Sequence, residues 1–498
     1  MKNIGILISR YNWILFILLF VFAAAFHLFN LGFSDLWSDE IYTKAMIDGS
    51  LSEFFVKLRN DLHPPLYYLL LKLFTSVFGL SAISLRVFSV IGVLSTFLVG
   101  YFAGRKIFGQ KGALYFCLLL LSIPMLASYS HEARMYTWAA FATTGVFIYS
   151  YLFLKSGENK NLILLFVFTI AAMYMHYYST IAAFTANAFV FVYLVVTRNR
   201  KWLPHFIMVV TAGILFLPWL QMMIVQVKKV QHAFWAPEVS FSTLLSCFTI
   251  PFTEQYWTTG YATALMILMY SLLVFTVFKS FTKPLAEYRI ILWLALSIFL
   301  GTLLIVSIIS LFSQPFLFHR YVMAIVVMLI IPHTILFMHL RSKVLIYTLI
   351  AAILFLGLKI SYSTFYFSYG PYNQTVQHLV KEYPGISKIV HITEITAGPL
   401  TEYSKGNKLQ HYWLKAEMSN VDAFSAIHQF SKPNEFLDAG EEFCVVKYLN
   451  LDLNQKNLDL ILSESEIMKT DTVTDNKVEY GSWIAIYHLR YKGEKPLP

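Results

Sequence analysis

The sequence predicts a polytopic α-helical membrane protein with about eleven transmembrane helices and a small soluble α/β or α+β domain at its C-terminal end. Of the 498 residues, 57% are hydrophobic, and apolar runs recur up to residue 360. These runs have about twenty residues each, the length needed to cross a hydrocarbon core ~30 Å thick. After Ser361, charged residues appear every few positions. The composition therefore excludes a soluble globular protein.

Eleven apolar segments are candidate transmembrane spans. They lie at 12–30, 85–104, 113–130, 135–154, 161–178, 180–197, 203–225, 259–278, 290–312, 321–340 and 344–360. The run Leu66–Phe78 is too short to cross and follows two prolines, so we expect an interfacial or re-entrant helix there. An odd number of crossings places the two ends of this module, residues 1–360, on opposite sides of the membrane.

The charges are divided unevenly along the chain, and their division predicts the topology. Residues 1–360 hold 25 Lys and Arg against 11 Asp and Glu, whereas residues 361–498 hold 13 against 17. Lys2 and Arg10 precede the first span, and the loops expected on their side are also basic. The positive-inside rule therefore predicts a cytoplasmic N-terminus and an extracytoplasmic domain at 361–498. The net charge of +10 reflects this topology and is not interpreted as nucleic-acid binding.

The C-terminal segment 361–498 is long enough to bury its own core. Runs at Lys388–Ile392, Glu442–Tyr448 and Trp483–Leu489 have the pattern of short strands, and Asn373–Glu382 that of a helix. The segment has no phosphate-binding glycine loop and no metal-ligand spacing. The three cysteines of the chain are widely spaced and indicate packing residues rather than disulfides or a zinc site.

The first outer loop, residues 31–84, concentrates ionisable side chains beside the membrane. Six of the eleven acids upstream of residue 361 lie between Asp35 and Asp61, and His63 follows directly before Pro64 and Pro65. Such clusters at a bilayer are costly and usually functional. An isolated Asp39-Glu40 pair is also compatible with an ordinary helix cap. Asp61 and His63 on the same loop shift the interpretation toward function.

Two further motifs are expected on the same side of the membrane. Arg134 stands at the start of a span, and Arg320 with His319 repeats this arrangement late in the chain. His176 and Tyr177 join two spans with almost no polar loop. An arginine at a helix end often only extends its head group to the water. Here two arginines, the histidines and the acids share one surface, which favours a site for an anion such as a phosphate.

At these residues the chain resembles a known group of enzymes, the GT-C superfamily glycosyltransferases. Within it, the resemblance is to bacterial family 39 members of the protein-mannosyltransferase and aminoarabinose-transferase group, and it covers roughly residues 10–340. The motifs that carry it are Ser38-Asp39-Glu40-Ile-Tyr42, Asp61-Leu-His63-Pro-Pro-Leu-Tyr-Tyr68, Leu85-Arg86, Glu132-Ala-Arg134-Met-Tyr136, His176-Tyr-Tyr and Phe216-Leu-Pro-Trp219.

The resemblance implies transfer of a sugar from a polyprenyl-phosphate donor to an acceptor hydroxyl, with inversion, at the outer face of a bacterial inner membrane. The acceptor is a glycan, a lipid or a protein, and the other partners are membrane lipids. The resemblance implies that Asp39 is the catalytic acid residue of the first outer loop, with Glu40 and Asp61 as further candidates. A single carboxylate with arginines suffices for this chemistry, because only the acceptor hydroxyl needs a base.

The resemblance also implies which residues bind the donor. Arg134 matches the phosphate contact, and Arg320 is a second contact. His63 stands where relatives have a lysine after an acid, whereas here Leu62 precedes it and Asp61 lies one step back. A divalent metal is left open, with Asp39 and His63 or His176 as ligands. The expected lining of the substrate cavity is Tyr42, Tyr67, Glu132, Tyr136, His176, Tyr177 and His319.

Two other classes of protein compete with this reading. A transporter or flippase for a lipid-linked glycan also places charges near a lipid head group, but its ionisable residues should lie inside the spans. An O-antigen-ligase-like enzyme or polymerase uses a similar donor but is built around a large outer loop late in the chain. This sequence puts its charged loop first.

Overall fold

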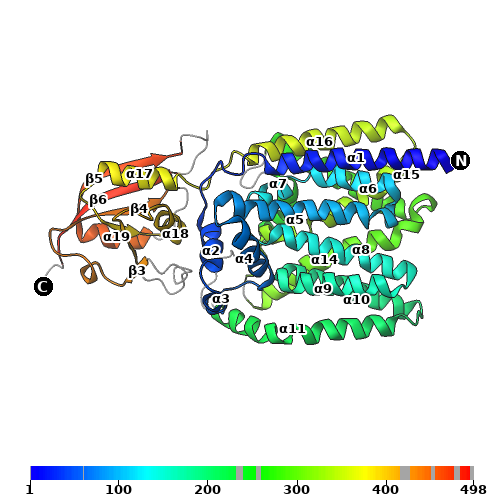
Figure 1. Ribbon diagram of the computed structural model, residues 1–498, viewed down its shortest axis with the longest axis horizontal. Coiled ribbons are helices and arrows are strands. Elements are labelled where there is room, and N and C mark those ends of the chain that lie inside the picture. The colour runs from blue at the N-terminus through cyan, green and yellow to red at the C-terminus, as the bar shows by residue number, and fades with distance from the viewer. Residues whose placement is uncertain are drawn as a thin grey trace. The chain divides into compact units, whose positions relative to one another are not determined.

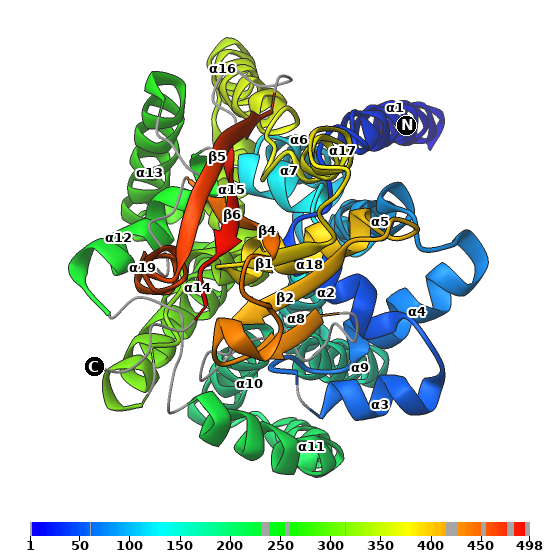
Figure 2. The same ribbon diagram turned by 90° about the vertical axis from the view of Figure 1, so that its left-hand side faces the viewer.

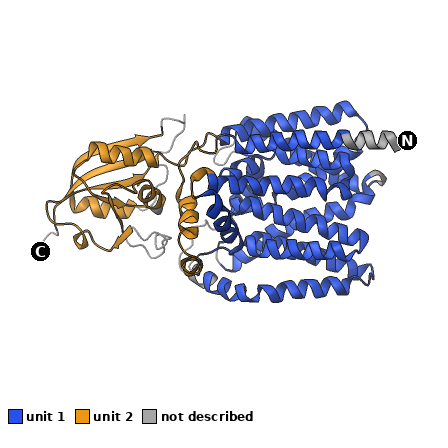
Figure 3. Ribbon diagram, viewed as in Figure 1, with its two compact units in different colours: residues 1–29, 58–79, 84–365 blue, residues 30–57, 80–83, 366–498 orange. Residues whose placement is uncertain are grey.

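The computed structural model describes residues 2–59, 61–230, 239–253, 259–313, 315–414, 427–449, 455–475 and 483–493. The chain forms two compact units. Unit 1 comprises residues 1–29, 58–79 and 84–365, and unit 2 comprises residues 30–57, 80–83 and 366–498 (Figure 3). Part of the first outer loop therefore belongs to the same compact unit as the C-terminal sheet.

Unit 1 is a bundle of long helices (Figure 1). Within it, α8 packs against α9 and α10, and α10 packs against α14. Its helices are α1 (Lys2–Leu28), α4 (Leu66–Phe78), α5 (Ala82–Phe102), α6 (Arg105–Leu121), α7 (Pro124–Ser130), α8 (Tyr136–Ser156), α9 (Asn159–Met175), α10 (Tyr177–Val196), α11 (Trp202–Val230), α12 (Phe241–Thr249), α13 (Gly260–Ser280), α14 (Arg289–Phe312), α15 (Ile330–His339) and α16 (Lys343–Thr364), with 3-10 turns η1 (Ile250–Phe252), η2 (Lys283–Tyr288), η3 (His319–Ala324) and η4 (Val326–Leu329).

Eight helices in the described part of the chain are long and apolar enough to cross a membrane. A ninth span results if α6 and α7, which are bent by 65° relative to each other, form one crossing. The two remaining predicted spans coincide with shorter apolar helices, Asn159–Met175 and Val326–His339. The multi-pass helical fold is thus confirmed, while the count of eleven stays a prediction. Leu66–Phe78 forms a 13-residue helix, in agreement with the expectation that it is too short to cross.

Helices α5 and α8 approach closely where Gly92 faces the start of α8. A Cβ atom at Gly92 would lie 2.6 Å from Oγ1 of Thr137. Small residues permit such close packing in membrane helices. The approach brings the middle of α5 against the turn that precedes α8, which carries Arg134.

Unit 2 is built on one six-stranded sheet with the order β3-β2-β1-β4-β6-β5 (Figure 2). The pairs β1–β2, β1–β4 and β2–β3 are parallel, whereas β4–β6 and β5–β6 are antiparallel. The predicted strands and helix of this domain are confirmed. Its elements are β1 (Lys388–His391), β2 (Gln410–Leu414), β3 (Ile427–Phe430), β4 (Glu442–Tyr448), β5 (Ser465–Thr474), β6 (Trp483–Tyr491), α17 (Tyr372–Glu382), α18 (Glu394–Tyr403), α19 (Gln455–Ser463) and the turn η6 (Pro433–Glu435).

Helices cover both faces of this sheet because strand side chains alternate between the two sides. Cys444 and Val446 of β4 join α17 and α18 in one core, and Phe443 and Val445 join α19 in the other. Unit 2 also contains α2 (Ser38–Ile47) and α3 (Leu51–Leu58) of the first outer loop. Helix α2 packs against α18.

Candidate functional site

Unit 1 brings together three of the ionisable residues that the sequence singles out. Nδ1 of His63 lies 3.3 Å from a carboxylate oxygen of Asp61, and Nη2 of Arg134 lies 3.4 Å from Nε2 of the same histidine. Asp61 is 2% exposed and Arg134 is 4% exposed. A carboxylate, an imidazole and a guanidinium therefore form one continuous chain of polar contacts, of which the carboxylate and the guanidinium are buried.

The local sequence fixes the acidic end of this chain. The Asp61 carboxylate accepts a hydrogen bond from the backbone N–H of His63, two residues on, which is typical of an Asp turn. Pro64 and Pro65 follow, and α4 begins at Leu66. Burial raises the pKa of Asp61, but His63 and Arg134 together outweigh burial and hold that pKa below its usual value. Asp61 is therefore ionised at neutral pH and orients the ring of His63.

The backbone around Arg134 is held by a serine from another helix. The Ser89 hydroxyl on α5 donates to the carbonyl of Glu132 at 2.6 Å and lies 3.4 Å from the carbonyl of Arg134. The N–H of Arg134 also donates to the Glu132 carbonyl. Nη1 of Arg134 lies 3.5 Å from the hydroxyl of Tyr68, in the first turn of α4. The guanidinium is thus positioned by α4, α5 and the turn before α8.

His176 completes the cluster from the junction of α9 and α10. Its Nδ1 accepts a hydrogen bond from the N–H of Tyr178, so a neutral ring carries its proton on Nε2. Burial, together with His63 and Arg134, holds the pKa of His176 well below its usual value. The ring centre lies 4.9 Å from that of Tyr321, 5.7 Å from Tyr136 and 6.1 Å from His63. His176 is therefore a neutral hydrogen-bond donor among aromatic rings.

This arrangement gathers hydrogen-bond donors and one fixed positive charge in a buried place. Arg134 supplies a planar fork that matches two oxygens of a phosphate, and charge-assisted hydrogen bonds of this kind are strong. The Tyr68 hydroxyl and the His176 ring add neutral donors. Such a set favours an anion and stabilises negative charge that develops on a leaving group.

Other residues expected at the site have different surroundings. Tyr67 is fully buried and packs against the rings of Tyr68 and Phe88. The Tyr177 hydroxyl donates to Gln226 and accepts a hydrogen bond from the indole of Trp219. His319 and Arg320 both lie against Phe318, at 4.3 and 5.0 Å from its ring centre.

The first-loop residues Asp39, Glu40 and Tyr42 lie on α2 in unit 2. Glu40 is fully buried and its carboxylate accepts a hydrogen bond from the N–H of Trp37, so it stabilises the start of its own helix. Asp39 and Tyr42 are half-buried. A helix cap is thus present, but Trp37 occupies the N-cap position and the Glu40 carboxylate supplies the hydrogen bond.

Sequence reasoning missed three residues that shape the cluster in unit 1, namely Tyr68, Ser89 and Tyr321. Tyr68 stands in the quoted motif, but its neighbour Tyr67 was assigned to the cavity, because the helix phase of α4 is not readable from the motif. Ser89 and Tyr321 carry no local signal, since a serine inside an apolar helix and a tyrosine in a short turn are both common.

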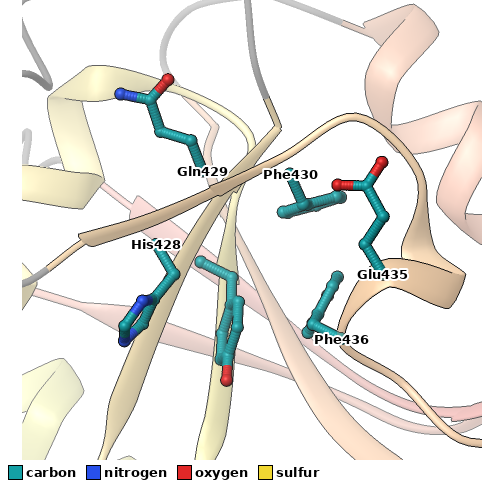
Figure 4. A pocket seen from close by; sticks show the side chains of 6 residues that line it. His428, Gln429, Phe430, Glu435 and Phe436 are labelled. Carbon is teal, nitrogen blue, oxygen red and sulfur yellow. The ribbon is translucent and has the colours of Figure 1, made fainter.

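Two other kinds of feature could mark a site among the described residues, namely metal-ligand groups and surface recesses. These residues contain no group of three or more His, Cys, Asp or Glu side chains placed to hold a metal ion. A recess of about 340 Å³ on β2, β3 and η6 is lined by Tyr412, His428, Gln429, Phe430, Glu435 and Phe436 (Figure 4). Its rings pack on one another, with Tyr412 stacked on Phe436 at 4.3 Å.

Comparisons with known proteins match both the motif region and the fold. Residues 62–223 match the family model of dolichyl-phosphate-mannose-protein mannosyltransferases. No curated protein matches the chain. The structure of ArnT from Cupriavidus metallidurans bound to undecaprenyl phosphate is similar with a TM-score of 0.61 and 11% identity, and the match covers 95% of this chain and 98% of that one. ArnT in the apo state matches with a TM-score of 0.49 and 11% identity, over 96% and 98% of the two chains.

The family model covers the residues that form the cluster from His63 to Arg134 and His176. The similarity to the undecaprenyl-phosphate-bound structure covers nearly the whole chain and concerns the fold. The resemblance predicted from the sequence motifs thus agrees with a match to the mannosyltransferase family model over residues 62–223 and with a fold similar to that of ArnT.

Proposed function

We propose that this protein is a membrane glycosyltransferase that moves a sugar from a polyprenyl-phosphate donor to an acceptor hydroxyl at the outer face of a bacterial inner membrane. The observation that carries the proposal is the buried contact of Arg134 with His63 and Tyr68. The planar fork of this guanidinium matches two oxygens of a phosphate, so the place suits an anionic donor head group. The similar fold of a protein bound to undecaprenyl phosphate supports the same class of donor.

The proposed reaction is a single displacement at the anomeric carbon of the donor sugar. The acceptor oxygen forms a bond to this carbon while the bond from the carbon to the phosphate oxygen breaks. The bonding electrons leave with the phosphate, and the acceptor proton passes to a carboxylate. One displacement inverts the configuration at the anomeric carbon.

Arg134 acts on the leaving group in this proposal. Negative charge on the phosphate grows as the carbon–oxygen bond breaks, so the hydrogen bonds from the guanidinium strengthen along the reaction. His176, held neutral with its proton on Nε2, adds a donor without adding a second positive charge. Asp61 holds His63 in one orientation and thereby keeps the chain of contacts to Arg134 in place.

Asp39 is the proposed base for the acceptor hydroxyl. Its assignment rests on its place in the first outer loop and on the motif Ser38-Asp39-Glu40-Ile-Tyr42. Glu40 is less suited to this role, because its carboxylate already stabilises the first turn of α2. A positioned base typically contributes ~10²–10⁴ to the rate.

The test combines binding with cell chemistry. The purified full chain in nanodiscs should bind undecaprenyl phosphate, and an excess of undecaprenol, the neutral alcohol with the same chain, should not compete. A strain that lacks the protein should accumulate a lipid-linked sugar, and the same sugar should accumulate when only an Asp39→Asn variant is present. Absence of both binding and accumulation would reject a polyprenyl-phosphate donor.

A further inference from the structure

Two consecutive residues at the end of α18 contact the chain on both sides of Asp39. The Lys44 ammonium lies 2.7 Å from the carboxylate of Glu402, and the Tyr403 hydroxyl accepts a hydrogen bond of 2.8 Å from the N–H of Leu36. Lys44 lies in the last turn of α2 and Leu36 just before its first turn. Both contacts are within unit 2. The α2 segment is therefore fastened to α18 at each of its ends.

The Lys44–Glu402 pair differs from an ordinary surface ion pair. The two side chains are 20% and 18% exposed. Burial raises the pKa of Glu402, but Lys405 and Lys44 outweigh burial and hold that pKa below its usual value. Lys405 is the exposed second partner of the same carboxylate, at 2.7 Å, and it lies outside α2.

Residues just before α2 also contact the C-terminal sheet domain, through aromatic stacking and a hydrogen bond. The indole of Trp37 stacks on the ring of Tyr369 at 4.3 Å with an angle of 6°. The carbonyl of Tyr369 accepts a hydrogen bond from Tyr448 on β4. The Asp35 carboxylate accepts a hydrogen bond of 2.7 Å from the N–H of Asn373, in the first turn of α17, where a negative charge is stabilising.

Ser404, the residue after Tyr403, connects the end of α18 to the sheet through hydrogen bonds. The Ser404 hydroxyl lies 2.6 Å from Nε2 of His411 on β2, and Nδ1 of His411 lies 2.8 Å from Nε2 of His391 on β1. All three side chains are buried. The end of α18 that contacts α2 is thus tied to two neighbouring strands.

We propose that the C-terminal sheet domain is a positioning element for catalysis, in which Glu402 and Tyr403 hold α2 and thereby keep the Asp39 carboxylate in one orientation. This inference rests on the proposed function, in which Asp39 is the base. Proton transfer requires hydrogen-bond geometry, and a misplacement of about 1 Å can cost ~10²-fold in rate. Glu402 and Tyr403 are positioning residues, since they act through α2.

The test uses variants that break one contact at a time in the full chain. The single variants Glu402→Gln, Tyr403→Phe and, from the other side, Lys44→Met should each lower sugar transfer by about tenfold or more. Undecaprenyl-phosphate binding in nanodiscs should stay unchanged in all three. Hydrogen exchange of the α2 amides should accelerate, while the amides of β4 and β6 keep their protection. Lys405→Met is the matched control, because it removes the exposed partner of Glu402 and leaves α2 fastened.

The reversed pair Lys44→Glu with Glu402→Lys separates positioning from a general loss of stability. It should restore part of the transfer and part of the α2 protection that the single changes lose, because the contact is rebuilt with opposite charges. Variants with fast α2 exchange and wild-type transfer would overturn the inference, as would variants whose α2 exchange is unchanged.

The outcome for Asp39 distinguishes this inference from the proposed function. If Asp39→Asn abolishes transfer and the Glu402 and Tyr403 variants are fully active, the positioning role fails and the function stands. If Asp39→Asn is active, the proposed base is wrong, and the positioning role that depends on it fails with it.

Discussion

The guanidinium of Arg134 lies 3.4 Å from Nε2 of His63, although 71 residues separate them in the chain. The contact joins the first outer loop to the turn before α8 within unit 1. The other ring nitrogen of His63 is engaged by Asp61. Asp61 therefore orients the ring of His63, and His63 in turn orients Arg134, the arginine proposed to hold the donor phosphate.

Variants of Arg134 should show how much of the phosphate affinity comes from the planar guanidinium and how much from its positive charge. Arg134→Ala should weaken undecaprenyl-phosphate binding by roughly 10–100-fold, since hydrogen bonds to charged groups contribute about 1.5–3 kcal/mol. Arg134→Lys keeps the charge but loses the fork, so it should retain part of the affinity. Titration in nanodiscs measures both, with Arg105→Ala, an exposed arginine at the start of α6, as the control. Wild-type affinity of Arg134→Ala would show that this residue is not the anchor.

Substitution of the two acids at the start of α2, Asp39 and Glu40, should affect sugar transfer very differently. Asp39→Asn should reduce transfer by ~10²–10⁴ without weakening donor binding, because a base acts on the acceptor. Glu40→Gln keeps a carbonyl oxygen that can accept the Trp37 N–H, so transfer should stay near that of the wild type. The measurement is the amount of lipid-linked sugar that accumulates in a deletion strain complemented with either variant. The reverse result would exchange the roles of the two acids.

Loss of the Ser89 hydroxyl should loosen the turn that carries Arg134. Ser89→Ala removes the hydrogen bond to the Glu132 carbonyl, and we expect donor affinity to fall several-fold with a loss of about 1 kcal/mol in stability. Thr96→Val is the matched control on the same helix, because the Thr96 hydroxyl binds only a carbonyl of α5 itself, that of Gly92. Equal donor affinities for the two variants would assign Ser89 to helix packing alone.

The buried histidine pair of unit 2 should make its sheet sensitive to acid. Burial lowers the pKa of His411 to about 4, and burial with His411 lowers that of His391 well below its usual value. The unfolded chain then binds more protons than the folded one below pH 6.5, so stability is full above that pH and falls as the pH drops toward 4. At pH 5 we expect a loss of about 2 kcal/mol from His411.

Hydrogen-exchange protection of β1 and β2 in the full chain, corrected for intrinsic rates, measures this effect between pH 7 and pH 5. His411→Asn should flatten the dependence. His428→Asn, a change at an exposed histidine of β3, should leave the dependence as in the wild type. A sheet equally protected at both pH values would contradict the assignment.

The membrane topology makes a prediction for labelling of intact cells. Lys408→Cys places a thiol on the exposed surface of unit 2, and Lys106→Cys places one in the basic loop at the start of α6. The three natural cysteines are buried, so their background should be low. A membrane-impermeant maleimide should label Lys408→Cys directly and Lys106→Cys only after permeabilisation. The opposite pattern would invert the proposed orientation.

The sequence by itself determined the membrane module and most residues of the cluster in unit 1. Hydropathy reports whether a segment of about twenty residues can leave water, and this property is local. For the same reason the strands and the helix of the C-terminal domain were readable from their periods. Asp61, His63, Arg134, Tyr136 and His176 were found because ionisable and aromatic groups beside a bilayer stand out from an apolar background.

Only the tertiary structure decided which partners these residues have. The choice between Tyr67 and Tyr68 depends on the helix phase of α4, and the role of Ser89 depends on its packing beside the turn before α8. The contact of Lys44 with Glu402 spans 358 residues of sequence, and α2 belongs to the same compact unit as the C-terminal sheet. Local patterns record how far a residue is buried but not what buries it, because pairing over long distances is selected by the packing of the whole fold.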